Sequence, residues 1–267
     1  MAAAKTRTET ILGAALEQIK TAAAPGWDWA RHLRTFCDRA QTIKHIDECT
    51  PASIVQSVIE TAKRGLSTTL STGHANYIPR RKKNSEVYYL TYLTGYQGIR
   101  HLLCRELGFS RILAQIVRPG EHFRVDYYHE EIEHTCDQDP GPADDLRAAY
   151  AVGVMPDGTK VWRVLWRDDL ERIKAKVLSQ PHGDDPPLWE TDWPAMCLKS
   201  AIRALGKAMD LPEVASGLLD DDDTALGRQV REAEAVPEPP APSTEDKATQ
   251  AQEDQWAKEA KEAGYAV

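Results

Sequence analysis

The spacing of apolar residues changes twice along this chain, and the two changes restrict the fold that it can adopt. Apolar residues recur every three or four positions as far as Gly65, as they do on amphipathic helices. They alternate with polar residues between Ala75 and Trp166, as on strands, and the helical spacing returns from Asp168. N-terminal helices, central antiparallel strands and hairpins, and C-terminal helices predict an α+β fold rather than an alternating α/β fold.

Two helices in the first 65 residues carry clear boundary signals. Residues 10–24 have helical spacing, and Pro25-Gly26 ends that stretch. Thr50 before Pro51 is typical of an N-cap followed by proline at the first helical position, and it predicts a helix that runs toward Gly65.

The strand signals indicate hairpins. Met155-Pro156-Asp157-Gly158-Thr159 is a turn sequence that joins the last two predicted strands. Gly95 and Gly98 bracket a predicted tight turn into a helix over residues 99–106. The predicted strands cover residues 75–79, 87–94, 111–117, 122–128, 130–135, 147–155 and 160–166.

Charge is distributed unevenly along the chain. The total is -8, yet residues 213–267 hold fourteen acids and five bases, a net of -9, which leaves +1 for the rest. Between Glu60 and Arg118, ten lysines and arginines stand against three acids, a net of +7.

We therefore expect one polyanion-binding domain over residues 1–211, with helices over residues 1–65, and an acidic, largely disordered tail over residues 212–267. This tail either solubilises the protein or docks a partner, with residues 256–267 as the candidate docking segment.

Two groups of basic residues are candidate phosphate contacts. One lies in the predicted connection between the first two strands, which contains Arg80, Arg81, Lys82 and Lys83. The other lies on the last long helix, which places Lys199, Arg203 and Lys207 opposite its apolar stripe, as an ordinary solvated helix face also would. Gln97 and Arg100 flank a helix start, where free backbone amides bind phosphate.

Several classes of function lack their sequence signals. The apolar runs are shorter than a membrane span, and the first ten residues lack the order of a signal peptide, so we expect a cytoplasmic protein without membrane contact. Five cysteines without a CxxC pair argue against disulfides and zinc fingers, and indicate reduced, mostly packed thiols. Gly206-Lys207 lacks the rest of a phosphate-binding loop, so the use of ATP has no support.

Two sets of side chains raise the question of a metal ion. The spacings of seven, five and two between His122, His129, His134 and Cys136 follow no common ligand pattern, and strand alternation would put some of them on opposite faces. A magnesium-dependent nuclease would need acidic positions, but a polar sheet face is the plainer interpretation of Glu121, Asp126, Glu130, Glu131 and Glu133. We expect no metal site and no catalytic residue.

Three blocks of sequence carry a family resemblance. The first is Gly65-Leu66, followed by Gly73-His74-Ala75 with Tyr77 and Pro79. The second is Gly95-Tyr96-Gln97-Gly98-Ile99, and the third is Met196 with Lys199-Ser200-Ala201-Ile202-Arg203 and Lys207. Their order and approximate spacing over residues 50–212 resemble the RecT/Red-beta family of phage single-strand DNA annealing proteins.

The resemblance implies ATP-independent annealing of complementary strands in phage-type homologous recombination, by a protein that forms rings or helical filaments on DNA. It implies single-stranded DNA and annealed duplex as ligands, with a 5′–3′ exonuclease and the host single-strand binding protein as partners. It implies no covalent chemistry, so the protein would not be an enzyme, and no cofactor beyond Mg²⁺ accompanying the DNA. A metal-dependent DNA nuclease and a generic single-strand binding module without annealing activity are the alternatives.

Annealing requires that bases stay exposed for pairing, so contacts should favour the DNA backbone. The candidate DNA-binding residues are Arg80, Arg81, Lys82, Lys83, Gln97, Arg100, Lys199, Arg203 and Lys207 for phosphates, with Tyr77, Tyr96 and Trp189 as stacking residues.

Overall fold

The computed structural model describes residues 6–81, 86–136, 141–179 and 188–209, and confirms the predicted mixture of helices and antiparallel strands. These residues belong to two compact units that meet in sequence between Gly98 and Ile99. The boundary lies inside the region 1–211, whose assignment to a single DNA-binding, annealing and oligomerisation domain stays a prediction. The acidic tail lies outside the described residues.

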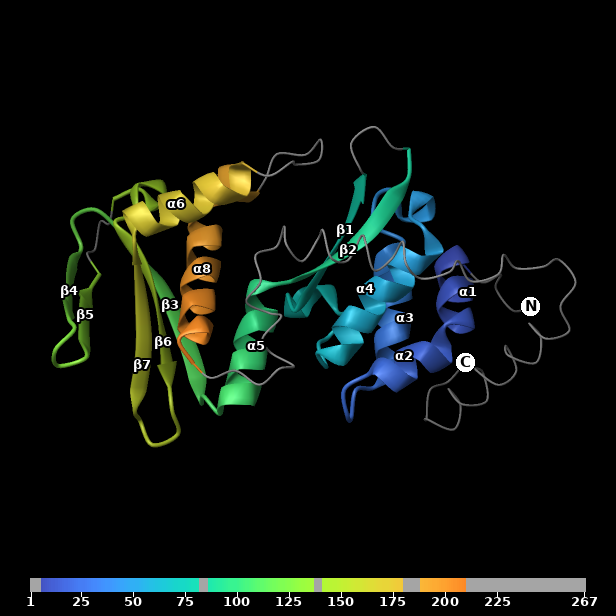
Figure 1. The fold of residues 1–267 in the computed structure, drawn as a ribbon, viewed down its shortest axis with the longest axis horizontal. Coiled ribbons are helices and arrows are strands. Elements are labelled where there is room, and N and C mark those ends of the chain that lie inside the picture. The colour runs from blue at the N-terminus through green and yellow to red at the C-terminus, as the bar shows by residue number, and fades with distance from the viewer. Residues whose placement is uncertain (1–5, 82–85, 137–140, 180–187, 210–267) are drawn as a thin grey trace, which may run out of the picture. The chain divides into compact units, whose positions relative to one another are not determined.

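Helices and one hairpin make up the first unit (Figure 1). Its strands β1 (Ala75–Arg81) and β2 (Tyr88–Thr94) pair antiparallel, as predicted. Helix α5 (Tyr96–Leu107) begins in this unit and continues into the second. The other elements are α1 (Arg7–Ala14), α2 (Leu16–Ala22), α3 (Trp29–Ala40), α4 (Pro51–Lys63) and the 3-10 turns η1 (Ile46–Glu48) and η2 (Leu70–Thr72).

The single helix predicted over residues 10–24 is wrong in one respect, because the structure has two helices there. Thr6 caps α1 together with Glu9 in a capping box, so the helix begins earlier than the apolar spacing indicates. Ala15, with φ -102° and ψ 10°, leaves the helical conformation and separates α1 from α2. Leu12 and Ile19 are buried on either side of the break, so the apolar stripe continues across it and does not reveal it.

Helix α4 lies at the centre of the first unit. It begins as predicted, with the Thr50 side chain accepting a hydrogen bond from the backbone of Ser53 at 3.3 Å. Most of its positions are buried, including two serines. Ser57 donates to the carbonyl of Leu90 at 2.9 Å, and the Ser53 hydroxyl accepts from the Leu90 amide at 2.9 Å. These bonds satisfy buried polar groups and fix strand β2 to the helix.

The last turn of α4 contains a largely buried ion pair. The carboxylate of Glu60 accepts hydrogen bonds from Arg64 and, at 3.2 Å, from Lys63. Burial alone would raise the pKa of Glu60, but the charge and hydrogen bond of Arg64, with those of Lys63, outweigh burial and hold this pKa below its ordinary value. The stabilising contribution of the carboxylate is therefore full above about pH 4.3 and is lost as the pH falls through the lowered folded-state pKa.

We expect Glu60→Gln to lower the free energy of unfolding by about 1–3 kcal/mol near neutral pH, because Arg64 loses its carboxylate partner. The difference from the wild type should shrink as the pH falls through the lowered pKa of Glu60, below which the wild-type carboxylate is also protonated. Thermal unfolding of both proteins from neutral to acidic pH measures this difference in stability. Glu17→Gln is the control, because its pair with Lys20 is exposed (81% for Glu17) and should contribute little. A Glu60→Gln effect that is independent of pH would contradict the prediction.

The second unit is built on strands. A three-stranded antiparallel sheet has the order β3 (Arg111–Val117), β6 (Ala148–Val154) and β7 (Lys160–Trp166), and β4 (His122–Asp126) pairs with β5 (Glu131–Thr135) as a separate hairpin. Every strand predicted here is present, with ends that differ by two residues or fewer. The remaining helices are α6 (Arg167–Leu178), α7 (Leu188–Thr191) and α8 (Trp193–Lys207), of which α8 lies against the three-stranded sheet (Figure 1).

One close contact within the second unit shapes the sheet. Gly153 of β6 lies under the ring of Phe109, and a Cβ atom at Gly153 would come within 2.6–2.9 Å of three ring atoms. Phe109 is buried, and so is Gly153. The ring therefore occupies the space that a side chain at position 153 would need.

No helix within the described segments of the chain is long and apolar enough to cross a membrane.

Candidate nucleic-acid interface

The β1–β2 hairpin positions the first group of predicted DNA-binding residues. Its base is fixed in the core by Leu90 and Tyr92, which are each 2% exposed, and its last ladder pair joins Arg81 to Tyr88. The amide of Thr50 donates to the carbonyl of Tyr88 at 3.0 Å, so the start of α4 holds the outer end of β2. Lys82 and Lys83 lie outside the described residues, and in sequence they directly follow Arg81, the last residue of β1.

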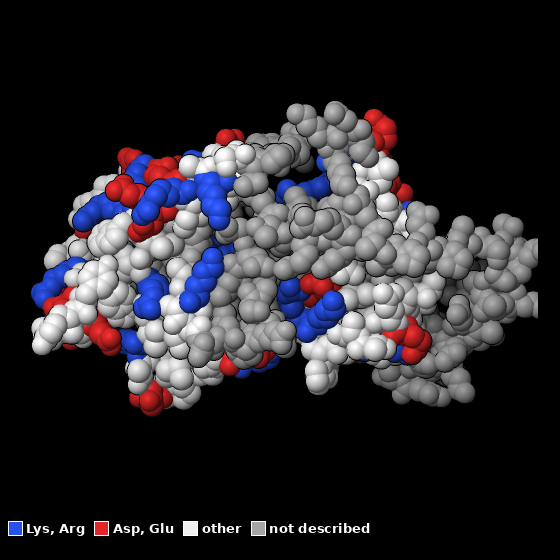
Figure 2. All heavy atoms as spheres, viewed as in Figure 1, with Lys and Arg blue, Asp and Glu red and all other residues white. Residues whose placement is uncertain are grey.

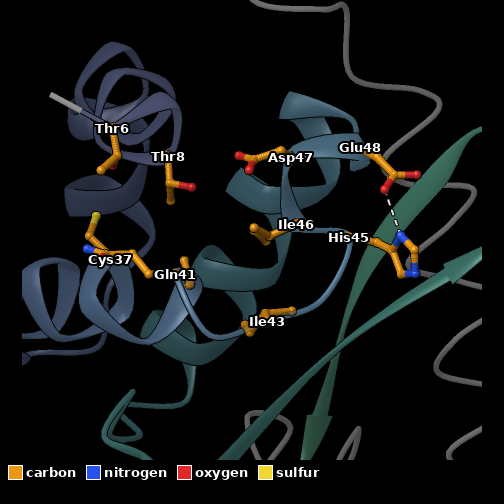
Figure 3. A pocket seen from close by; sticks show the side chains of 10 residues that line it. Thr6, Thr8, Cys37, Gln41, Ile43, His45, Ile46, Asp47 and Glu48 are labelled. Atoms are coloured by element: carbon orange, nitrogen blue, oxygen red, sulfur yellow. Dashed lines mark hydrogen bonds and ion pairs between the residues drawn. The ribbon is translucent and has the colours of Figure 1, made fainter.

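Arg81 ends a row of stacked groups. Its guanidinium lies over the ring of Tyr88, 5.9 Å from the centroid, and it pairs with Glu86 at 3.7 Å. The other neighbour of Tyr88 is His45, whose ring is stacked at 4.7 Å and 11°. His45 in turn contacts the carboxylate of Glu48 at 2.6 Å (Figure 3). The predicted phosphate ligand Arg81 is exposed, and its guanidinium lies over the ring of Tyr88.

A pocket of about 360 Å³ lies beside this row in the first unit. Figure 3 shows that α1, α3 and the η1 turn contribute its lining side chains, among them His45, Asp47 and Cys37. Burial raises the pKa of the Cys37 thiol to about 12, so the thiol stays protonated and unreactive near neutral pH. Burial likewise raises the pKa values of Cys49 and Cys197 to about 12, as expected for packed thiols.

Two of the sequence blocks meet at a glycine junction. The amide of Gly95 donates to the carbonyl of His74 at 2.9 Å. A Cβ atom at Gly95 would lie 2.1 Å from the carbonyl oxygen of Gly73, and one at Gly98 would lie 2.3 Å from that of His74. Glycine is therefore required at both positions because one backbone segment lies directly on the other.

The same junction corrects the predicted turn before α5. The helix begins at Tyr96, so Gly98 lies inside its first turn rather than at the end of a loop. Gln97 is exposed on this turn, whereas Tyr96 and Arg100 are half-buried. The assignment of Gln97 and Arg100 to phosphate, and of Tyr96 to stacking, stays a prediction.

The basic column on α8 differs from its prediction. Lys199 is only 7% exposed, Arg203 is half-buried and Lys207 is exposed, so exposure rises along the column. The prediction that all three lie on a solvent-facing side is wrong for Lys199. The helix is buried over more of its circumference than one apolar stripe, because Ser200 is buried beside Ala201 and Ile202.

Two predicted stacking residues have packing roles in the structure. The ring of Tyr77 is 5% exposed, meets the edge of Phe36 at 4.8 Å and lies under Arg39 at 4.9 Å. Its hydroxyl bonds to Thr61 at 2.8 Å. Trp189 is also 5% exposed and packs on Trp193, with ring centroids 5.6 Å apart. Neither ring offers a face on which a base could stack.

The acidic positions of the β4–β5 hairpin have separate partners. Asp126 accepts hydrogen bonds from the amides of Tyr128 and His129 in the turn, and the His129 amide bond is the largest cause of the lowered pKa of Asp126. Glu133 pairs with His122 at 3.8 Å. Among the described residues, no cluster made of carboxylates alone has the spacing of a metal site. This arrangement does not favour a magnesium-dependent nuclease.

Aromatic exposure identifies side chains that the sequence did not single out. Tyr128 is 89% exposed and Tyr127 is 65% exposed in the turn between β4 and β5. Two adjacent tyrosines at the end of the strand predicted over residues 122–128 were the available signal. Their acidic neighbours Asp126, Glu130 and Glu131 make this turn a poor match for a polyanion.

Charge on α6 is of mixed sign, in contrast to the run of four cations at positions 80–83. Figure 2 shows blue and red side chains intermingled over α6. Arg167 pairs with Glu171 at 3.5 Å and with Asp145 at 3.6 Å, and Arg172 pairs with Asp169. The cations of α6 are thus largely balanced by neighbouring acids.

The structure places Arg80 and Arg81 at the end of β1, and the basic column Lys199, Arg203 and Lys207 on α8. β1 belongs to the first unit and α8 to the second, and DNA contact by both groups of basic residues stays a prediction. Consecutive cations at positions 80–83, the first two of them at the end of the anchored strand β1, are suited to hold a polyanion by its backbone.

The chain belongs to the RecT family, because the model of that family matches residues 31–238. The match includes the hairpin, the glycine junction and α8. The chain is similar to Protein RecT of Escherichia coli strain K12, with 27% identity over 196 residues that cover 72% of this chain and 70% of that protein. Family membership agrees with the recombination and single-strand DNA annealing expected from the sequence.

Proposed function

We propose that this protein binds single-stranded DNA and anneals complementary strands without ATP, acting as an oligomer in phage-type homologous recombination. The observation that carries the proposal is the family match over residues 31–238. The consecutive cations Arg80, Arg81, Lys82 and Lys83 support it, and the first two of them end the anchored strand β1.

The mechanism follows from the physics of a charged polymer. Cations of the hairpin neutralise phosphates and release counterions, which provides affinity for any sequence. Because these contacts are made to the backbone, the bases stay available to a complementary strand. Base pairing and stacking then supply the free energy of annealing, so the step needs no nucleoside triphosphate. Protein side chains position the strand, and no covalent step is assigned to them.

An annealing assay with two complementary labelled oligonucleotides tests this function. We expect the protein to accelerate duplex formation in a buffer that contains no ATP, with both strands recovered at full length. Shortened strands in the presence of Mg²⁺ would instead identify a nuclease. Binding without faster annealing would identify a generic single-strand binding module and would overturn the proposal.

Assembly and partners belong to the same proposal. We propose rings or helical filaments on DNA, a 5′–3′ exonuclease that supplies the single strands, and the host single-strand binding protein as a further contact. The place of action would be the cytoplasm of the bacterial host. Negative-stain images of the protein with and without oligonucleotide test the assembly directly, and particles of monomer size under annealing conditions would contradict it.

A further inference from the structure

Three potential metal ligands from different segments of the sequence meet at one end of the β4–β5 hairpin. Glu121 precedes β4, His134 lies on β5 and Cys136 follows β5. One ligand atom from each of the three side chains lies within 4.8 Å of the other two. His134 and Cys136 are close to one another and to Glu121, whereas His122 contacts Glu133 and His129 contacts Asp126. Of the three histidines and one cysteine that the sequence analysis considered as metal ligands, only His134 and Cys136 therefore lie together, and the third member of the group is Glu121.

The spacing and the ligand types suit zinc. Four-coordinate zinc with bonds of ~2.0–2.3 Å places its ligand atoms about 3.3–3.6 Å from one another. Nε2 of His134 and Oε2 of Glu121 are 3.2 Å apart, close to that range. A thiolate with an imidazole and a carboxylate is a donor set that zinc prefers and that magnesium does not.

Neighbouring groups hold two of the ligands in place. The side chains of Glu121 and His134 are only 4% and 5% exposed. Nδ1 of His134 lies 3.1 Å from the hydroxyl of Tyr150, so its other nitrogen faces Glu121. The Arg118 amide donates to Oε2 of Glu121 at 2.5 Å, and Arg147 donates to the Glu121 carbonyl at 3.2 Å. Outer contacts of this kind orient metal ligands and raise affinity.

The third ligand is accessible. Cys136 is exposed, in contrast to Cys37, Cys49 and Cys197, which are buried thiols. A metal ion at this place would therefore have three protein ligands and one position open to water or to an added ligand.

We propose that Glu121, His134 and Cys136 bind one zinc ion, which joins the start of β4 to the end of β5 and so closes this end of the hairpin. The sequence led us to expect no metal, and this proposal revises that expectation. An isolated two-stranded hairpin is marginally stable, so a metal ion that joins its two strands would stabilise it, and the hydrogen bond of His134 to Tyr150 of β6 keeps the ligand in place. The proposal is independent of DNA annealing and is tested without DNA.

The test uses the full chain, freed of metal by a chelator and kept reduced. Zinc is titrated in competition with a chromogenic chelator, and Co²⁺ is used as a spectroscopic probe. We expect one equivalent of zinc, a sulfur-to-cobalt charge-transfer band, and a higher melting temperature with zinc. Cys136→Ser should weaken zinc binding at least about 10- to 100-fold and remove the band.

Two variants serve as matched controls. Cys104→Ser changes a half-buried thiol elsewhere, and His122→Gln changes an exposed imidazole that belongs to the other face of β4. Both should bind zinc as the wild type does. If His134→Gln loses zinc, circular dichroism must show the wild-type fold for the loss to support the site. A wild-type protein that binds no zinc, or a Cys136→Ser variant that binds it equally well, overturns the proposal.

Discussion

Replacing Arg81 and the two lysines that follow it in sequence by glutamine is expected to weaken single-strand DNA binding about 100-fold at ~0.1 M salt, because each phosphate contact on a single strand contributes about 0.7 to the slope of log K against log salt. The slope should fall by about 2 for three lost contacts. Arg80 is left unchanged because it is half-buried. Fluorescence anisotropy with a labelled oligonucleotide at several salt concentrations measures both quantities. The variant carries Arg81→Gln, Lys82→Gln and Lys83→Gln.

An equal change of charge elsewhere in the same unit separates local contact from net charge. Three exposed cations outside the hairpin provide this control, and all are replaced by glutamine: Arg31, Arg34 and Lys44. This second variant should retain nearly the wild-type slope. If both variants lose affinity equally, only the overall charge matters, and the hairpin is not the binding element. An unchanged slope in the hairpin variant would exclude it as a phosphate contact.

Gly98→Ala is expected to lower the free energy of unfolding by about 3 kcal/mol or more, because its new methyl group would overlap a backbone carbonyl rather than a flexible side chain. The Cβ atom would lie 2.3 Å from the carbonyl oxygen of His74 and 3.0 Å from Cγ2 of Thr94. Alanine is the better helix former by about 1 kcal/mol, so intrinsic propensity acts in the opposite direction and is outweighed. Urea denaturation measures the difference.

The control is the same substitution where space is available. A Cβ atom at Gly13 of α1 would meet no atom within 4 Å. Gly13→Ala should therefore leave the protein as stable as before or stabilise it by up to about 1 kcal/mol. Two helical glycines would then respond to one substitution with opposite signs. Similar changes in the free energy of unfolding for Gly98→Ala and Gly13→Ala would show that the close approach of His74 to Gly98 does not destabilise the alanine variant.

Strands and hairpins were predictable because their signals are local. The alternation in β7 and the turn at Asp157-Gly158 are properties of neighbouring residues, and the structure has the strand at its predicted bounds. The N-cap of α4 was predictable for the same reason. Ala15 gives no comparable signal, because its small apolar side chain is compatible with both a helix and a break.

The candidate sites were only partly predictable, because burial depends on tertiary contacts. Helical spacing identifies which side of α8 is apolar, but it does not reveal that the helix is also covered around Lys199. Residue type marks Tyr77 as aromatic without showing that Phe36 and Arg39 enclose its ring. The meeting of Glu121 with His134 depends on strand pairing across a turn, which no linear spacing reports.

The contact between Phe109 and Gly153 has a consequence for how relatives of this chain can differ. Because the ring fills the space above the glycine, a larger residue at position 153 is compatible with this sheet only if position 109 carries a smaller one. The two positions are therefore expected to covary among homologous sequences, although they lie more than forty residues apart in the chain. Their joint variation would record a packing constraint of the sheet unit rather than any property of the DNA.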